Sequence, residues 1–368
     1  MPVRYQVGLD VTDPEGAGSF SGKTVLVNTV NTAEGTMGAG VALAFKERYP
    51  DIMMPYKALT EGGHMYGGDL RVLKDDGDLQ ILAMATKQSW KNPSKNIWVG
   101  AGLLRLAHHL HAMPRNGEGV RVLLPRPGCG NGGLDFADVN RMIRSLLGHS
   151  RAEIIVSVSS PEEAFLLRPH EWRPIYAGIG TRKSTPEQDA VMRGIATICG
   201  ARGLVLRSGH ATGSDAAFEA GYRDWQKHPK FVENGSGAAI YLHTNKSGPD
   251  LIPYKPWPAM LGIAERFHDT PLALGLSADV IEGRKQPGDE AALMARNGHQ
   301  IFGDDFSHIT DAVVCCTPGG NSEGGTGQAL RMARLVGIPV IDIGHPDHAK
   351  TKPADIVRSE EHTSELQS

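Results

Sequence analysis

The chain has 368 residues, of which 40% are hydrophobic and 21% are charged, and its formal net charge is −3. This composition excludes an intrinsically disordered chain and argues against a large basic surface for nucleic acid, although it allows a local basic patch. The length predicts two or three domains. The four cysteines lack the spacing of a zinc site or a disulfide framework, and neither a secretion signal nor a membrane span is recognisable, so a cytoplasmic location is expected.

Glycine is unusually abundant, with 45 residues, and it gathers in clusters. Each cluster follows an apolar run and precedes a helical pattern, which is where backbone N–H groups can bind a phosphate. The clusters lie at 35–40, 128–133, 178–180, 209–213 and 319–327. The sequence therefore predicts a nucleotide-binding protein with two binding sites.

The first half of the chain alternates short β-rich runs with helical patterns, which is typical of α/β folds. A charged segment with two prolines, 159–173, ends this series, and we place a domain boundary there. Strands are expected at 24–28, 80–85, 121–125 and 153–158, and helices at 40–49, 98–112 and 136–147.

In the second half the pattern starts again, and its first strand, turn and helix resemble a Rossmann-like unit. Strands are expected at 174–180, 204–207, 238–242, 312–316 and 339–343, helices at 186–199, 214–221, 291–297 and 325–336, and a long loop at 245–257. The expected fold is α/β, with two three-layer α/β/α domains: the first, 1–168, has a mixed sheet, and the second, 174–357, is Rossmann-like. The last residues, 358–368, fit no part of this pattern and are interpreted as a non-native, adapter-derived tail.

Three blocks of the first half place small or reactive residues where a predicted strand ends. The first runs from Asn28 through Asn31 to Val41, and the last, 125–135, is rich in glycine, so the two can hold a diphosphate between them. Between them, the block 85–94 carries Lys87 at a strand end. Partial desolvation of an amine favours its neutral form, which can act as a base or as a nucleophile. Alternatively, Lys87 is an exposed strand-end lysine and Asn31 an ordinary turn residue.

These blocks, in this order, resemble the macrodomain family, which binds ADP-ribose. The resemblance covers 25 to about 147 and is greatest to the branch of bacterial DNA ADP-ribosyl glycohydrolase antitoxins and terminal ADP-ribose protein glycohydrolases. It implies that Lys87 is catalytic, acting at C1″ of the distal ribose, and that Asn31 touches this ribose. The further ADP-ribose contacts that it implies are Asp10, Asn28, Met37, Gly38, Gly40, Val41, Thr86, Gly128, Cys129, Gly130, Asn131, Gly132, Gly133 and Leu134.

Two positions depart from the family pattern. Many macrodomains carry Gly-Asp at the end of the first strand to bind the adenine amine, whereas here Asp10 is displaced by one residue from Gly8. The protein-directed glycohydrolases also carry Asp after the Gly-Cys-Gly turn, whereas this sequence has Asn131 there, as the DNA-directed branch does. The second departure favours ADP-ribosylated nucleic acid as the substrate.

The second half resembles the SLOG superfamily, which includes DprA-like and lysine-decarboxylase-like (cytokinin-activating) proteins. Its motifs place backbone donors at helix N-termini, as a phosphate ligand requires. The residues implied in nucleotide binding are Gly178, Gly180, Thr181, Arg182, Ser208, Gly209, Gly213, Ser214, Asp215, Gly319, Gly320, Gly324, Gly325 and Thr326. Cytokinin-activating members place a catalytic Glu three residues after the Gly-Thr of this last motif, where this chain has Ala329. Binding or sensing of a nucleotide, such as a NAD-derived signal, is therefore favoured over hydrolysis at this site.

The functional expectation is an ADP-ribosyl hydrolase, with DNA favoured over protein as the acceptor, coupled to a nucleotide-sensing domain. The expected partners are ADP-ribose or ADP-ribosylated DNA or protein, a nucleotide at the second site, and a second copy of the chain, without membrane, metal or cofactor. One alternative is a reader or sponge that binds ADP-ribose-type ligands without turnover, and another is a hydrolase of free ADP-ribose derivatives. The pairing of two such domains suggests a conflict between phage and host.

Overall fold

The computed structural model of the chain describes residues 3–113, 119–165, 173–231, 236–244, 246–253, 258–267, 280, 287–348 and 352–355. It contains two six-stranded sheets with helices, which confirms the predicted α/β class. The chain divides into two compact units: unit 1 comprises Met1–Pro169 with Asp304–His308, and unit 2 comprises His170–Gly303 with Ile309–Ser368. The predicted tail at 358–368 lies outside the described residues. Within the described ranges, no helix combines the length and hydrophobicity that crossing a membrane requires.

The sheet of unit 1 has the strand order β1-β6-β5-β2-β4-β3, in which only β3 runs antiparallel to its neighbour. The sheet is therefore mixed, as predicted. Its central strands are buried on both faces, which explains why they read as continuous apolar runs in the sequence. The strands are β1 (Arg4–Val7), β2 (Gly22–Asn31), β3 (Leu70–Asp75), β4 (Leu79–Lys87), β5 (Gly119–Leu124) and β6 (Glu153–Val158).

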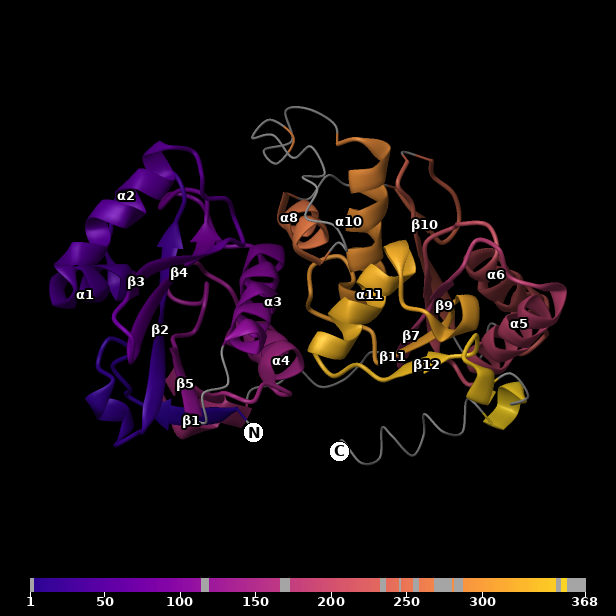
Figure 1. Cartoon of the computed structure of the whole chain (residues 1–368), viewed down its shortest axis with the longest axis horizontal. Helices are drawn as coiled ribbons and strands as arrows, with labels where there is room; N and C mark the ends of the chain where they lie inside the picture. The colour runs from indigo at the N-terminus through magenta and orange to yellow at the C-terminus, as the bar shows by residue number, and fades with distance from the viewer. Residues whose placement is uncertain are drawn as a thin grey trace. The chain divides into compact units, whose positions relative to one another are not determined.

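Helices cover both faces of this sheet, with α1 and α2 on one side and α3 and α4 on the other (Figure 1). The start of α4 is fixed by Asp135, whose side chain accepts a hydrogen bond from the backbone N–H of Ala137. The helix α2 and the edge strands β1 and β3 were not predicted. The two strands are largely exposed and lack a continuous buried pattern. The helices are α1 (Gly40–Arg48), α2 (Met53–Glu61), α3 (Asn96–Ala112) and α4 (Phe136–Leu147).

The sheet of unit 2 is entirely parallel, with the order β10-β9-β8-β7-β11-β12. From β9 to β12 this is the strand order of a doubly wound Rossmann-like sheet. The chain first adds β8 and β9 on one side of β7, and later adds β11 and β12 on its other side. The two-residue β10 falls within the predicted loop at 245–257. The strands are β7 (Ile175–Gly180), β8 (Val205–Ser208), β9 (Gly237–Tyr241), β10 (Leu251–Ile252), β11 (Ala312–Cys316) and β12 (Val340–Asp342).

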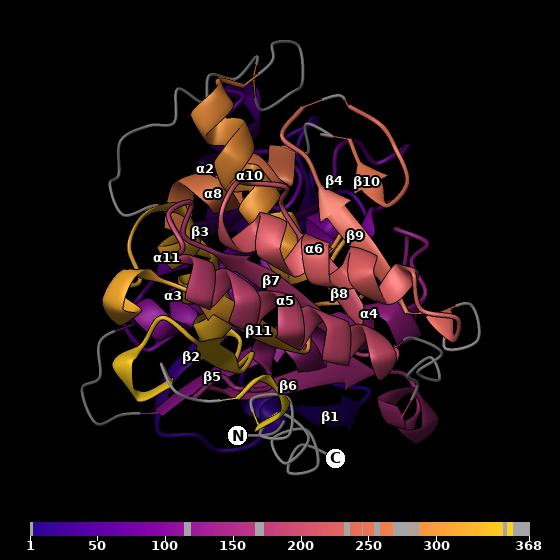
Figure 2. The same cartoon turned by 90° about the vertical axis from the view of Figure 1, so that its right-hand side faces the viewer.

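Two groups of helices cover this second sheet. Helices α5 and α6 pack together on one face, toward the viewer in Figure 2, and α8, α10 and α11 cover the other face (Figure 1). A capping box fixes the start of α5, because Thr185 and Gln188 each bond the other's backbone N–H. The helices are α5 (Pro186–Ala201), α6 (Ser214–Gln226), α8 (Pro258–Phe267), α10 (Asp289–Phe302) and α11 (Gly324–Leu335).

Candidate functional site

The two predicted catalytic residues of unit 1 lie side by side where parallel strands end. Asn31 is the last residue of β2 and Lys87 the last of β4, and the strand register makes them direct partners. A register irregularity between Val30 and Asn31 brings about this pairing. The carboxyl ends of parallel strands meet at one edge of a sheet, where open α/β folds bind their ligands.

The Lys87 ammonium is held at this edge by the loop that follows β5. The side chain is half-buried, and its Nζ donates a hydrogen bond to the backbone carbonyl of Asn131. The amide of Asn131 lies next to the start of α1, since a Cβ placed on Gly40 would be 3.4 Å from its Nδ2. Three chain segments, ending β4, following β5 and starting α1, therefore converge around Asn131.

Asn31 is oriented by its own turn and by α2. Its Oδ1 accepts hydrogen bonds from the backbone N–H groups of Ala33 at 3.3 Å and Glu34 at 3.2 Å. The hydroxyl of Tyr56 donates to the backbone carbonyl of Asn31 at 2.9 Å, and its distance to Oδ1 is 3.3 Å. Burial raises the pKa of Tyr56 far above its usual value, so this hydroxyl stays a donor. With Oδ1 engaged, the Nδ2 amide is the group that Asn31 offers to a ligand.

The start of α1 is open to an anion. Gly38 and Gly40 are exposed, Val41 is half-buried, and no side chain caps the helix. Uncapped backbone N–H groups and the positive end of the helix dipole favour a phosphate at this position. Two of the predicted contacts lie below the surface of the site: Asn28 and Met37 are fully buried, and the Asn28 Nδ2 donates to the Met37 Sδ at 3.5 Å. These two residues support the site from beneath.

The loop after β5 requires glycine at several positions. Gly128 and Gly133 both have φ +75°, and the N–H of Leu134 donates to the carbonyl of Gly128 at 3.0 Å. A Cβ on Gly132 would stand 2.2 Å from that carbonyl and 2.3 Å from the Ser94 Oγ. Gly130, by contrast, is exposed with open space around it, so the tip of the loop is accessible to a ligand.

The remaining predicted contacts of unit 1 have different environments. Burial raises the pKa of the Cys129 thiol to about 12, so Cys129 stays a neutral, half-buried side chain. Thr86 is buried in β4 directly before Lys87. Asp10 is exposed, and its Oδ1 accepts from the backbone N–H of Thr12 at 2.9 Å and from the Thr12 hydroxyl at 2.8 Å. This carboxylate therefore first of all organises the turn after β1.

Unit 2 contains a cavity of about 560 Å³ where β7 and β11 end. This is the point at which the strand order reverses, and it is the usual ligand position of doubly wound sheets. Half of the predicted nucleotide contacts line the cavity: Gly180, Thr181, Arg182, Asp215, Gly324, Gly325 and Thr326. Ala329, which stands where a related hydrolase motif has Glu, lines it too.

The other predicted contacts of unit 2 do not line this cavity. Gly178 is required for packing, because a Cβ there would lie 2.6 Å from the Phe218 ring. Ser214 bonds the carbonyl of Thr181 at 3.0 Å through both its backbone N–H and its hydroxyl. The residues outside the lining are Gly178, Ser208, Gly209, Gly213, Ser214, Gly319 and Gly320. Several of them shape the loops from which the lining residues project.

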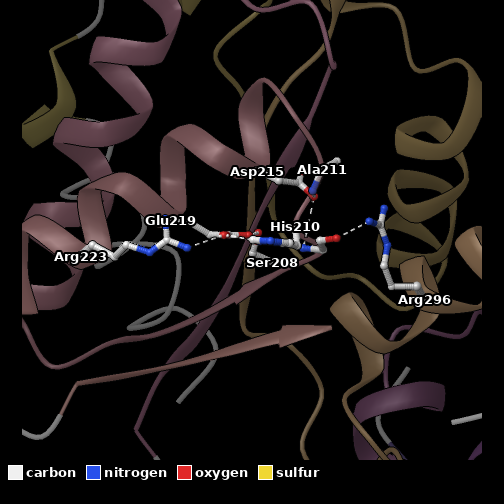
Figure 3. Close-up of polar contacts among 8 residues, drawn as sticks. Ser208, His210, Ala211, Asp215, Glu219, Arg223 and Arg296 are labelled. Carbon is white, nitrogen blue, oxygen red and sulfur yellow. Dashed lines mark hydrogen bonds and ion pairs between the residues drawn. The ribbon is translucent and has the colours of Figure 1, made fainter. Parts of the chain in front are cut away.

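Two buried carboxylates, Glu219 and Asp215, hold the loop between β8 and α6 (Figure 3). Glu219, with 1% of its surface exposed, accepts hydrogen bonds from the Ser208 hydroxyl at 2.8 Å and from Arg223 at 3.2 Å, and lies 2.8 Å from the His210 Nδ1. His210 adopts the left-handed backbone conformation, with φ 60°. Glu219 thus fixes a strained turn, and neither Ser208 nor His210 needs a ligand to satisfy its bonding.

Opposite charges face each other beside the cavity (Figure 3). The Asp215 carboxylate accepts from the backbone N–H groups of Gly209 at 3.2 Å and Ala211 at 3.3 Å, and burial raises its pKa to about 6. Arg296 donates to the carbonyl of Gly209, while its Nε has no partner. Burial lowers the pKa of Arg296, the charge of Asp215 opposes this shift, and the charge of Arg182 adds to it. The cavity lining therefore combines two arginines, Arg182 and Arg296, with two carboxylates, Asp215 and Glu323.

Among the lining residues that sequence reasoning missed are three polar ones on α10, Arg296, Asn297 and Gln300. Arg296 is 7% exposed and Gln300 is 2% exposed, and the Gln300 Nε2 has no hydrogen-bond partner. Asn297 donates to the carbonyl of Gly325 at 3.0 Å and to Gln328 at 3.1 Å, which ties α10 to the start of α11. Polar residues within the apolar pattern of this helix were the available signal, but a lone helix gives no indication of which loop it faces.

Sequence comparison finds relatives for a third of the chain. The chain is 37% identical over 123 residues to the DNA ADP-ribosyl glycohydrolase of Mycobacterium tuberculosis, covering 33% of this chain and 34% of that protein. It is 39% identical over 127 residues to the enzyme of the same name from Thermus aquaticus, covering 33% of each chain. Among solved structures, the macrodomain of Mycobacterium tuberculosis DarG is 28% identical with a TM-score of 0.36, covering 43% of this chain and 98% of that one. No protein-family model matches.

The predicted macrodomain resemblance of the N-terminal half is confirmed by these sequence relatives, which are named as DNA ADP-ribosyl glycohydrolases. The chain spans about a third of the length of the curated relatives that it matches. The SLOG resemblance of the second half has no such relative here and stays a prediction.

Proposed function

We propose that unit 1 hydrolyses ADP-ribose from a modified DNA base, with Lys87 as the catalytic residue. The observation that carries the proposal is the pairing of Lys87 with Asn31 at the strand-end edge, next to the uncapped start of α1. The names of the sequence relatives support both the activity and the acceptor. The exposed Asn131, which departs from the protein-directed branch, supports DNA as well.

In this reaction the backbone donors hold the diphosphate and the polar side chains hold the distal ribose. The start of α1 and the loop 128–133 donate to the phosphates, and the Asn31 Nδ2 donates to a ribose hydroxyl. The carbonyl of Asn131 keeps the Lys87 amine in one place. As a base, the Lys87 amine takes a proton from a water molecule whose oxygen bonds to C1″, while the modified base leaves with the electron pair of the broken bond and takes up that proton. As a nucleophile, the amine bonds to C1″ and expels the base, and water then hydrolyses the adduct and regenerates the amine.

The test is release of ADP-ribose from an ADP-ribosylated thymidine-containing or guanosine-containing oligonucleotide, followed by mass spectrometry. The full chain is expected to release ADP-ribose, and Lys87→Ala is expected to lose at least about 100-fold in rate. Lys57→Ala is the matched control, since Lys57 is an exposed lysine of unit 1 that pairs with Glu61. Equal activity of wild type and Lys87→Ala would contradict the proposal. Intact ADP-ribose recovered from a stoichiometric complex, without turnover, would favour the reader or sponge.

For unit 2 we propose the binding of a nucleotide, in line with the predicted SLOG resemblance. The supporting observation is the cavity at the ends of β7 and β11, which Arg182 lines together with two buried donor atoms that have no partner, the Arg296 Nε and the Gln300 Nε2. Calorimetry with AMP, ADP, NAD and ADP-ribose tests it, using Arg182→Ala against Lys183→Ala, the exposed neighbouring cation that does not line the cavity. Binding that Arg182→Ala leaves unchanged would contradict this assignment.

A further inference from the structure

An exposed tryptophan lies beside the catalytic edge of unit 1. Trp90 follows Lys87 by three residues, and 64% of its surface is exposed, although indole side chains are usually well buried. The ammonium of Lys91 lies 5.5 Å from the centroid of the Trp90 ring. We call residues 89–92 the Trp90 turn.

The Trp90 turn is held in place from its inner side. The hydroxyl of Ser89 donates to the carboxylate of Glu34, and the backbone N–H of Trp90 donates to the same carboxylate at 3.3 Å. The N–H of Asn92 closes the turn on the carbonyl of Ser89 at 3.1 Å. Glu34 follows Asn31 in the chain, so the turn is anchored to the segment that carries the second candidate catalytic residue. A fixed turn presents the indole without a large ordering cost on binding.

The stretch of chain around this turn is cationic. Between Asp78 and Glu118 the sequence contains no acidic residue, whereas Lys87, Lys91 and Lys95 follow at intervals of four. The Lys95 ammonium lies over the Trp98 ring, 4.7 Å from its centroid. Two carboxylates contact this stretch: Glu34 bonds the Trp90 turn, and the Asp305 Oδ2 accepts from the Asn96 Nδ2 at 3.4 Å, so the three lysines outnumber them. The local charge therefore complements a polyanion, even though the whole chain is slightly acidic.

We propose that the Trp90 turn is the docking surface for the single-stranded DNA that flanks the modified base, with Trp90 stacking on an unpaired base and Lys91 contacting a phosphate. This inference rests on the proposed function, because it deepens the substrate of the same site. An exposed aromatic ring next to lysines is how proteins hold single strands without reading their sequence. A base that must be acted on has to leave the helical stack, so a single strand is the accessible form.

The first experiment measures binding without turnover, so that it does not depend on catalysis. Fluorescence anisotropy follows a labelled, unmodified 12-mer of single-stranded DNA with the full chain, Trp90→Ala, Trp90→Phe and Lys57→Ala. Trp90→Ala is expected to weaken binding by about tenfold, Trp90→Phe to retain most of it, and Lys57→Ala to leave it unchanged. Lys91→Ala should lower the dependence of affinity on salt by about one phosphate contact. Absence of DNA binding by the wild type overturns the proposal.

The second experiment separates docking from chemistry. Rates are compared on an ADP-ribosylated oligonucleotide and on the corresponding ADP-ribosylated mononucleoside, which cannot reach the Trp90 turn with a flanking strand. Trp90→Ala should lose about tenfold in kcat/KM on the oligonucleotide only. An equal loss on both substrates assigns the turn a merely structural role and overturns the proposal. DNA binding that depends on Trp90, without any ADP-ribose release, refutes the proposed hydrolysis and leaves the docking surface standing.

Discussion

In unit 1 the side chains of Tyr56 and Lys87 donate to the backbone carbonyls of Asn31 and Asn131. The buried unpaired atoms near this edge, the Asn28 Oδ1 and the Ser94 Oγ, are a carbonyl oxygen and a hydroxyl. In unit 2 the cavity is flanked by buried groups with an atom left unpaired, on Arg296 and Gln300. A buried donor without a partner costs stability, so it is retained where a ligand supplies the acceptor.

This difference indicates two kinds of ligand. A half-exposed amine next to an open loop can act on a group that projects from a macromolecule. A cavity of about 560 Å³ with buried donors suits the whole of a small anionic molecule. The same topological position, the carboxyl edge of a parallel sheet, is thus the proposed place of catalysis in one unit and of ligand enclosure in the other.

The largest expected effect concerns Lys87. In Lys87→Arg the positive charge and the donor to Asn131 remain, but a guanidinium stays protonated and cannot act as base or nucleophile. Release of ADP-ribose should therefore fall by at least about 100-fold in a single-turnover assay. If the variant keeps more than a tenth of the rate, Lys87 acts through its charge alone, and the chemical contrast between the two units disappears.

The loop after β5 gives the next largest effect. Gly132→Ala should lower the free energy of unfolding by about 2 kcal/mol, because its Cβ would overlap the carbonyl of Gly128 and the Ser94 hydroxyl. Gly130→Ala is the matched control and should change it by less than about 0.5 kcal/mol, since nothing lies within 4 Å of its added Cβ. Urea denaturation of unit 1 measures both. Similar values for the two variants would show that the loop adapts and is not preformed.

A change at Gln300 tests the unpaired donor of unit 2. Gln300→Met keeps the length of the side chain and removes the unpaired Nε2, so stability should stay the same or rise. Affinity for the bound nucleotide should fall by about tenfold, because the ligand loses a buried hydrogen bond. Thermal denaturation and calorimetry give the two quantities. A loss of stability with unchanged affinity would mean that the donor belongs to the fold.

The smallest effect is a pH dependence at Asp215. Its pKa is raised to about 6 by burial, so the carboxyl is neutral below that pH and no longer offsets the charge of Arg296. Sulfate, whose charge is constant in this range, should bind a few-fold more tightly at pH 5 than at pH 7.5. The raised pKa of Asp215 also contributes to the stability of the fold. This contribution is complete below the unfolded pKa of about 3.9 and is lost as the pH rises through 6.

Asp215→Asn should remove most of the change in sulfate affinity between these two pH values. The neighbouring His243, whose pKa is lowered by burial and by Arg296, accounts for what remains. A full pH dependence in Asp215→Asn would assign the titration to His243 and exclude Asp215 as the group that tunes the cavity.

Much of the candidate site could be read from residue types at strand ends. Glycine marks the turns that need a left-handed backbone or a close approach of two chain segments, as at Gly128 and Gly180. The blocks around Asn31 and Lys87 follow apolar runs that are long enough to be recognised as buried strands. The short exposed strands β1 and β3 could not be found this way, because edge strands without a buried face carry no periodic signal.

The sequence by itself determined the α/β class and the positions of the glycine turns, since these depend on local patterns, and the family resemblance of its motifs made Lys87 the predicted catalytic residue. Only the tertiary structure decided that β2 and β4 are neighbours in register, which brings Asn31 and Lys87 together. It also decided that α10 places Arg296 and Gln300 at the cavity that the glycine loops of other segments form. Such pairings arise from packing between distant segments, which no local pattern encodes.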